Sequence, residues 1–208
     1  MKEEVSYYSS GSKISALLGC PEGFRSGVKY PAIVINHGYS GNKEEYNDMA
    51  GELNKNGFVT LQFDSRGCGS TQGVRGRMMC NTEWLEDAEC AVTYISSLDF
   101  VDQERIGFTG CSMGGAITLY IAALDSRIKC AVAMAPLSDG KEQLEKLWIE
   151  RKGRGAWESF LNEIEQDMKK VVLHNSSRYV SVPYALCMLR KDEIDFHKAR
   201  DEDPNLVR

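Results

Sequence analysis

The segment with the clearest chemical meaning is Gly-Cys-Ser-Met-Gly-Gly at residues 110–115. It joins an apolar stretch at 106–109, typical of a buried strand, to small and apolar residues at 116–123, typical of a helix. A serine at such a tight turn needs small neighbours, and its hydroxyl then projects beside a helix N-terminus that favours developing negative charge. Ser112 is therefore predicted to be a catalytic nucleophile. The alternative is a glycine-rich turn that only packs a helix against a strand.

A second segment, His-Gly-Tyr-Ser-Gly at residues 37–41, directly follows the apolar run at 31–36. Backbone N–H groups in a loop at this place can bind an oxygen on which charge grows during acyl transfer. We expect the backbone N–H groups of Tyr39 and Met113 to form this oxyanion hole. His37 is a candidate general base, but its position equally suits a histidine that only shapes the loop.

A third segment, Asp-Ser-Arg-Gly-Cys-Gly at residues 64–69, follows the apolar run at 58–63. Asp64 could be the acid of a catalytic triad. Alternatively, Asp64 and Arg66 bond to nearby backbone or to each other, and the glycines permit unusual backbone angles. We favour the turn, because the triad order that accompanies this serine motif places the acid after the serine.

These segments lie at the ends of regularly alternating elements. Strands are expected at 13–18, 31–36, 58–63, 105–109 and 129–135, and helices at 43–55, 82–97 and 113–124. Successive strand–helix–strand crossovers favour an α/β fold, with a doubly wound, mostly parallel sheet flanked by helices. We assign residues 1–136 to this core. Residues 137–208 are charged and largely helical, with a break at 151–155, and are expected to form a separate segment.

The three motifs, in this order and spacing, resemble the α/β-hydrolase superfamily, closest to its esterase and aminopeptidase-like branches. The resemblance covers about residues 10–136. It implies that 137–208 is a helical cap whose aromatic residues wall an acyl pocket. It also implies two further strands, carrying the triad aspartate and histidine.

The last part of the chain departs from that pattern. No strand followed by a histidine loop of the family type is recognisable in 137–208. Val-Val-Leu-His at 171–174 faintly resembles a last strand, but a helical pattern runs directly into it, so His174 and His197 are assigned to a surface or cap-packing role. The triad acid and base are then expected beyond Arg208, and the fold is expected to be incomplete at its C-terminal end.

Three explanations fit this departure: a fragment of a longer protein, a truncated reading frame, or a non-catalytic descendant. We favour the first two, because the three motifs are intact and the loss is confined to one end. A shortened sheet would expose a strand edge and an apolar face, which predicts self-association.

Composition excludes several other classes of protein. The formal charge is -5 and no basic block is present, which argues against nucleic-acid binding. No apolar run is long enough to span a membrane. The seven cysteines show no metal-ligand spacing, and no phosphate-binding glycine loop is present, so no metal or cofactor is expected. Reduced thiols favour a cytoplasmic location. Cys111 is interpreted as buried packing, and a redox role for Cys68 and Cys80 is not favoured.

The sequence thus predicts a hydrolase that acts on a small acyl substrate: a carboxylic ester, thioester or small amide, cleaved through an acyl-enzyme on Ser112. The main alternative is a catalytically incomplete binding or scaffold protein that retains the pocket. Carbon–carbon bond cleavage and acyl transfer on the same scaffold remain open, because the cap sets the substrate.

Overall fold

The computed structural model describes residues 2–39, 41–71 and 82–176 of the 208-residue chain. The chain divides into two compact units, Met1–Ser138 and Asp139–Arg208. The first unit holds all three sequence motifs and is built around a sheet, while the described part of the second unit is helical. Each unit is described on its own.

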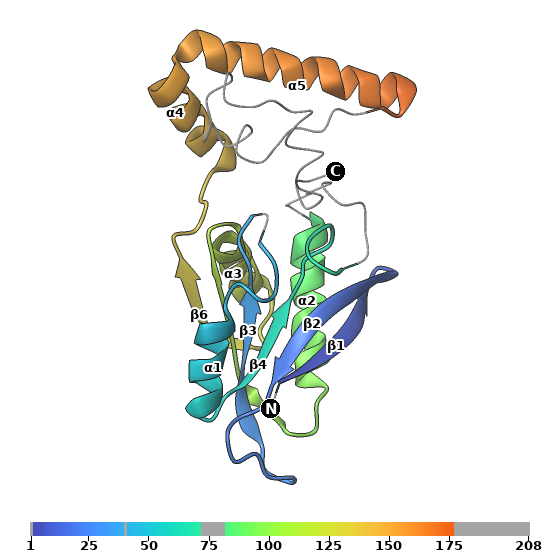
Figure 1. Ribbon diagram of the computed structural model, residues 1–208, viewed down its shortest axis with the longest axis vertical. Coiled ribbons are helices and arrows are strands. Elements are labelled where there is room, and N and C mark those ends of the chain that lie inside the picture. Colours follow the sequence, from blue (N-terminus) through green and yellow to red (C-terminus); the bar gives the residue numbers. More distant parts are fainter. Residues whose placement is uncertain (1, 40, 72–81, 177–208) are drawn as a thin grey trace, which may run out of the picture. The chain divides into compact units, whose positions relative to one another are not determined.

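The sheet of the first unit has six strands in the order β1-β2-β4-β3-β5-β6 (Figure 1). The strands are β1 (Lys2–Ser9), β2 (Ser12–Gly19), β3 (Tyr30–Asn36), β4 (Val59–Phe63), β5 (Val101–Cys111) and β6 (Ile128–Met134). The pairs β4–β3, β3–β5 and β5–β6 are parallel, whereas β1–β2 and β2–β4 are antiparallel. This confirms the predicted α/β class with a mostly parallel sheet.

Strand β1 was not expected from the sequence. It forms a hairpin with β2 through the two-residue turn Ser10–Gly11, across which Ser9 pairs with Ser12. Both turn residues have positive φ, at 42° and 81°. That geometry matches the twist of the flanking strands and explains why a glycine stands at the second position.

Helices cover both faces of the sheet: α1 (Asn47–Lys55), α2 (Thr82–Ser96) and α3 (Met113–Leu124). Alternate side chains of β4 show which face each helix covers. Gln62 bonds to Asn47 of α1, whereas Phe63 points into the core that contains α2 and α3. The first helix therefore lies on one face and the other two lie on the opposite face (Figure 1).

The prediction of a helix from residue 43 is wrong at its start, because α1 begins at Asn47. Residues 43–46 are a turn, and the Lys43 side chain is buried against Asp64 rather than displayed on a helix surface. A tertiary contact therefore overrides the helical pattern at this point.

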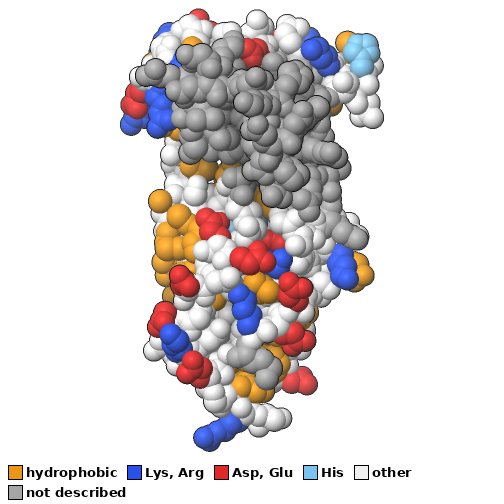
Figure 2. All heavy atoms as spheres, viewed as in Figure 1, with side chains coloured by type: hydrophobic (Ala, Val, Ile, Leu, Met, Phe, Trp, Pro, Cys, Tyr) orange, Lys and Arg blue, Asp and Glu red, His pale blue; other side chains and the backbone are white. Residues whose placement is uncertain are grey.

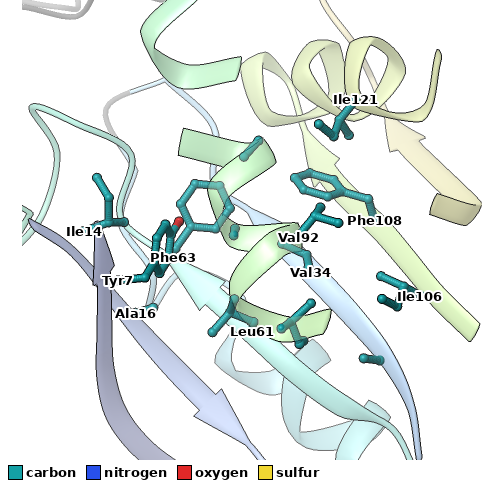
Figure 3. Close-up of a cluster of buried hydrophobic side chains, with 14 of the residues drawn as sticks. Tyr7, Ile14, Ala16, Val34, Leu61, Phe63, Val92, Ile106, Phe108 and Ile121 are labelled. Carbon is teal, nitrogen blue, oxygen red and sulfur yellow. The ribbon is translucent and has the colours of Figure 1, made fainter. Parts of the chain in front are cut away.

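The main core lies between the sheet and the helices α2 and α3 (Figure 3). Phe63, Leu61 and Phe108 contribute from the strands and are essentially inaccessible to solvent. The predicted inward face of α2 is confirmed, since each of its members is fully buried: Trp84, Ala88, Ala91, Val92 and Ile95. This core fixes the strands whose ends carry the three motifs.

The second unit contains two helices, α4 (Gly140–Lys152) and α5 (Arg154–His174), separated at Gly153 with φ 84°. The predicted break in this region is therefore confirmed. Trp148 stacks on Phe160 with ring centroids 4.3 Å apart, and Trp157 completes this small buried cluster.

Candidate active site

The register of the parallel strands brings the three motifs to one edge of the sheet. Asn36 at the end of β3 pairs with Phe63 on one side and with Gly110 on the other. The segments that follow these three residues therefore begin side by side. The Asn36 amide contributes a further link, since its Nδ2 donates to Ser65 Oγ at 3.0 Å.

Ser112 occupies the turn between β5 and α3 with φ 56° and ψ −116°. Its backbone N–H donates to the Met134 carbonyl at 2.9 Å, and its own carbonyl accepts from the N–H of Ala116 at 3.0 Å. A non-glycine residue in this conformation costs about 1–3 kcal/mol and persists only where its surroundings enforce it. The tight turn that the sequence predicted at this serine is present, and its backbone is strained.

Glycines surround the turn because the backbone segments approach too closely for a side chain. A Cβ on Gly114 would lie under 3.0 Å from the carbonyl oxygens of Asn36 and His37, and one on Gly110 would meet the backbone of Gly114 equally closely. The start of α3 is therefore packed directly against the end of β3.

The loop after β3 passes beside the nucleophile. A Cβ built on Gly38 would lie 3.6 Å from the Ser112 Cβ. Tyr39 follows immediately in this loop, and Met113 is the first residue of α3, where a backbone N–H has no partner within the helix. The structure thus brings the loop that carries Tyr39 to the start of the helix that carries Met113.

His37 is buried, with 1% of its surface exposed, and both of its ring nitrogens are bonded to backbone groups. The Ser65 N–H donates to Nε2 at 3.0 Å, so Nδ1 carries the proton and donates to the Gly38 carbonyl at 2.7 Å. Burial lowers the pKa of His37 below its usual value, which favours this neutral form. The geometry therefore supports the loop-shaping interpretation of His37 rather than a general base.

The contacts of Asp64, like those of His37, hold a loop in place. It is fully buried and accepts from the Lys43 N–H at 2.6 Å, from Lys43 Nζ at 3.0 Å and from the Ser70 N–H at 2.8 Å. Burial alone would lower the pKa of Lys43, but the hydrogen bond and charge of Asp64, aided by Glu44, raise it overall. The turn interpretation of this segment is supported, although the buried partner Lys43 was missed.

Arg66 does not bond to Asp64, which was one of the expected arrangements, but faces away toward α2. Its backbone N–H and its Nη2 both donate to Asp87, at 2.8 Å and 2.6 Å. Asp87 is fully buried, and the indole N–H of Trp84 donates to the Arg66 carbonyl at 3.1 Å. The turn at 64–70 is therefore bonded on one side to Lys43 and on the other to α2.

Cys111, interpreted from the sequence as buried packing, is half-buried instead. Tyr46 lies near this thiol, and burial, followed by the charges of Glu45 and Cys111, raises the pKa of Tyr46. Two side chains beside the nucleophile were thus not assigned to the site by sequence reasoning. The signal that could have found Tyr46 is its position just after the motif at 37–41.

The other two histidines of the chain belong to the second unit. His174 is the last residue of α5 in the second unit and is exposed, while His197 lies outside the described residues, as does Cys80. Among residues 2–39, 41–71 and 82–176, no group of His, Cys, Asp or Glu side chains could hold a metal ion. Nor is any helix in these ranges long and apolar enough to cross a membrane.

Comparison with solved structures defines the class of protein. The crystal structure of the α/β hydrolase GrgF from Penicillium sp. sh18 matches the whole chain with a TM-score of 0.70 and 21% sequence identity, and the match covers 68% of GrgF. The fold of this chain is thus that of an α/β hydrolase.

The chain belongs to the family described as serine aminopeptidase, S33, whose profile matches residues 29–194. It is 28% identical over 187 residues to an uncharacterized 31.7 kDa protein from the traX-finO intergenic region of Escherichia coli, covering 89% of this chain and 62% of that protein. It is 32% identical over 133 residues to the acyltransferase drtE of Aspergillus calidoustus, covering 60% of this chain and 43% of that protein. The chain therefore spans about three-fifths of the first relative's length and less of the second's.

Proposed function

We propose that this chain carries the nucleophile and oxyanion hole of a serine hydrolase that cleaves a carboxylic ester, a thioester or a small amide. The observation that carries the proposal is the positive φ of Ser112, at 56°, in a turn packed so closely that a Cβ at Gly110 or Gly114 would overlap backbone atoms. Such strain is retained where the surrounding structure enforces it, and it clusters at catalytic residues.

In the proposed mechanism, Ser112 Oγ attacks the carbonyl carbon of the substrate and loses its proton to a general base. The carbonyl oxygen becomes an oxyanion, which accepts hydrogen bonds from the backbone N–H groups of Tyr39 and Met113. Collapse of this intermediate releases the alcohol, thiol or amine and leaves an acyl group on Ser112. Water then attacks the acyl group, and the carboxylic acid leaves.

The general base and its acid partner are proposed to lie outside the described residues. His37 does not supply the base, because both of its ring nitrogens are bonded to backbone groups. A serine hydroxyl without a base is a poor nucleophile at neutral pH. The backbone bonds of both His37 ring nitrogens therefore support a second candidate function. In it, the protein is catalytically incomplete and binds an acyl group at the same site.

The acyl-enzyme can also pass its acyl group to an acceptor other than water. The relative drtE is named an acyltransferase, which supports acyl transfer as a variant of the same chemistry. In either case Ser112 is acylated first. We also propose that the helices after Ser138 form the cap that selects the acyl group, and that the protein is cytoplasmic, which is supported by the free thiols of the five described cysteines.

A fluorophosphonate tests the proposal directly, because it phosphonylates an activated serine. The intact mass of the treated chain would show one adduct, which peptide mapping would place on Ser112 and which Ser112→Ala would abolish. Heat-denatured protein is the control for non-specific reaction. A folded chain that gains no adduct would contradict acyl-enzyme formation by this chain and would favour the binding protein.

We further propose that two copies associate through β6. This edge strand reads Lys-Cys-Ala-Val-Ala-Met at residues 129–134, and Val132 is 55% exposed. Figure 2 shows hydrophobic side chains gathered on the side of the first unit where β6 runs. Exposed apolar side chains of the adjacent helix α3 extend the surface: Leu119, Tyr120 and Leu124.

The charges along β6 favour a second copy as the partner. Edge strands are normally protected by lysine, proline or bulges, but residues 130–134 carry none of these charges or prolines. Lys129 at one end already pairs with Glu104. Two-fold antiparallel pairing about Ala131 would place each Lys129 opposite an apolar residue of the other copy, so like charges would not meet.

A further inference from the structure

The loop that carries Tyr39 is held at both ends by a single turn, residues 64–70. At its start, the Ser65 N–H donates to His37 Nε2 at 3.0 Å. At its end, Lys43 donates to Asp64 through both its backbone N–H and its Nζ, at 2.6 Å and 3.0 Å. The two contacts are made by adjacent residues of the turn, so one short segment bonds both ends of the loop.

The contact at Lys43 is the stiffer of the two because it is charged, bidentate and dry. The side chains of Lys43 and Asp64 are 2% and 0% exposed. Charge-assisted hydrogen bonds are shorter and roughly twice as strong as neutral ones, and a dry interior screens them little. Asp64 is fixed in turn by the Ser70 N–H, and a Cβ at Gly69 would overlap its carboxylate. The position of Lys43 is therefore set by a carboxylate that cannot itself move.

The start of the loop lies close to the nucleophile. Gly38, one residue from His37, already lies in contact range of Ser112, and Tyr39 follows it. An oxyanion donor must lie about 2.7–3.1 Å from the position that the charged oxygen will occupy. A displacement of the loop by an ångström would therefore remove most of the contribution of the Tyr39 N–H.

We infer that Asp64 is a positioning residue, which acts through Lys43 to hold the backbone N–H of Tyr39 in the oxyanion hole. The inference rests on the proposed function of Ser112. It assigns to this buried carboxylate a part in transition-state binding without contact with the substrate. The effect should therefore fall on the rate of the chemical step rather than on the binding of the reagent.

The same turn offers a matched control in Asp87. This carboxylate is also fully buried and also binds a backbone N–H and a cationic side chain of its partner, Arg66. It bonds the turn to α2 rather than to the loop. Asp87→Asn should therefore destabilise the fold to a similar extent as Asp64→Asn without displacing Tyr39.

The experiment compares Asp64→Asn with Asp87→Asn in the full chain, using two measurements. The first is fluorophosphonate labelling of Ser112, separated into the inactivation rate constant and the reagent's binding constant. Asp64→Asn should lower the rate constant at least about tenfold, a fraction of the hundredfold or greater loss that follows removal of an oxyanion donor. Its effect on the binding constant, and the effect of Asp87→Asn on either constant, should stay within about twofold.

The second measurement is amide deuterium exchange of the peptide that covers residues 37–43, which does not depend on the reactivity of Ser112. Asp64→Asn should raise exchange in this peptide at least about tenfold relative to Asp87→Asn, because the end of the loop is released. If Asp64→Asn proves too unstable, the double variant Lys43→Met with Asp64→Asn removes both charges together. It avoids an unpaired buried charge and should give the same two results.

Equal exchange of this peptide in the two aspartate variants would overturn the inference, as would labelling of Asp64→Asn at the wild-type rate. A wild-type chain that never labels would instead contradict the proposed function. In that case the exchange measurement alone would still decide whether Asp64 positions the loop.

Discussion

The centre of the sheet and its edge at β6 differ in how many of their side chains are bonded or buried within the chain. At the carboxyl ends of β3, β4 and β5, buried side chains such as His37, Asp64 and Asp87 are bonded within the first unit. Along β6 and the outer face of α3, apolar side chains that could be buried are exposed instead. Most buried polar groups at the centre are therefore paired within the first unit, with the exception of Asn36 Oδ1, which has no hydrogen-bond partner among the described residues. The border instead has the composition of a surface that a partner covers.

The difference indicates that the three motifs determine stability and chemistry, whereas the exposed apolar surface determines association. A buried polar group without a partner costs about 1–3 kcal/mol, so the pairing of His37, Asp64 and Asp87 stabilises the fold at the centre. Exposed apolar area carries no such penalty for local structure, but it favours association. Changes at the centre should therefore alter folding and chemistry, and changes at the border should alter association alone.

The largest effect is expected from Gly114→Ala at the centre. The added methyl group would overlap the carbonyl oxygens of Asn36 and His37, neither of which can give way. We expect a loss of about 3 kcal/mol or more in the free energy of unfolding, measured by urea denaturation, since overpacking of this kind commonly costs 1–3 kcal/mol and backbone must shift here. Labelling of Ser112 should be lost with it.

Gly51→Ala is the control for this change, because Gly51 lies inside α1 and no atom lies within 4 Å of the added group. It should stabilise the chain by up to about 1 kcal/mol, the difference in helix propensity between the two residues. A Gly114→Ala variant as stable as wild type would show that the site is less tightly packed than its geometry indicates.

The lowered pKa of His37 predicts that the free energy of unfolding depends on pH through a group at the centre of the sheet. Its pKa is lowered in the folded state, so between that value and the unfolded value of about 6.5 the unfolded chain binds more protons. The stability that the neutral ring contributes is present above pH 6.5 and is lost as the pH falls through this window. The slope should approach about 1.4 kcal/mol per pH unit.

Urea denaturation at several values between pH 7.5 and pH 5.5 would measure this slope. His37→Asn, which keeps a short polar side chain but cannot titrate, should remove most of it. If both proteins show the same slope in this window, His37 is not the group responsible.

At the border, Val132→Lys should weaken self-association while leaving the fold intact. The new charge would face the other copy across the edge strand and should weaken the dimer by at least about tenfold, or 1.4 kcal/mol. Light scattering coupled to size-exclusion chromatography over a range of concentrations would measure the mass. Val28→Lys, at a comparably exposed position before β3, is the control.

A wild-type chain that is monomeric at every concentration would refute association through β6, and so would a dimer that Val132→Lys does not weaken. In the first case the surface would be left for a different polypeptide, such as a further strand of a longer chain.

The smallest effect is expected from a comparison of two Ser112 variants, which distinguishes the backbone strain at this residue from its reactivity. Ser112→Gly and Ser112→Ala should both abolish labelling, but only glycine adopts a φ of 56° at low cost. The glycine variant should therefore be more stable than the alanine variant by about 1 kcal/mol, the lower end of the strain expected at such a position. Equal unfolding midpoints for the two variants would show that the turn is not strained.

Local chemistry explains which parts of this structure could be predicted from the sequence. Ser112 was found because tight turns need glycine, and α2 was found because its apolar residues repeat with the period of a helix. The positions of the buried strands along the chain followed from their apolar runs, and their mostly parallel pairing from the intervening helices.

Long-range pairings account for most of what was missed. The partner of Asp64 is 21 residues away at Lys43, within a segment whose periodicity indicated a helix. The partner of Arg66 is equally distant at Asp87. Strand β1 was missed because its residues are mostly charged or polar, and its pairing with β2 depends on the turn at Ser10 and Gly11.

The pairing of Asn36 with both Phe63 and Gly110 makes the site a product of late assembly. Its three components come from strand ends that are far apart in the chain and lie beside one another only when β3 has docked between β4 and β5. Contacts of such high sequence separation form slowly, because loop closure must precede them. If Ser112 reacts as proposed, the time at which a refolding chain becomes reactive would therefore report when the centre of the sheet has closed.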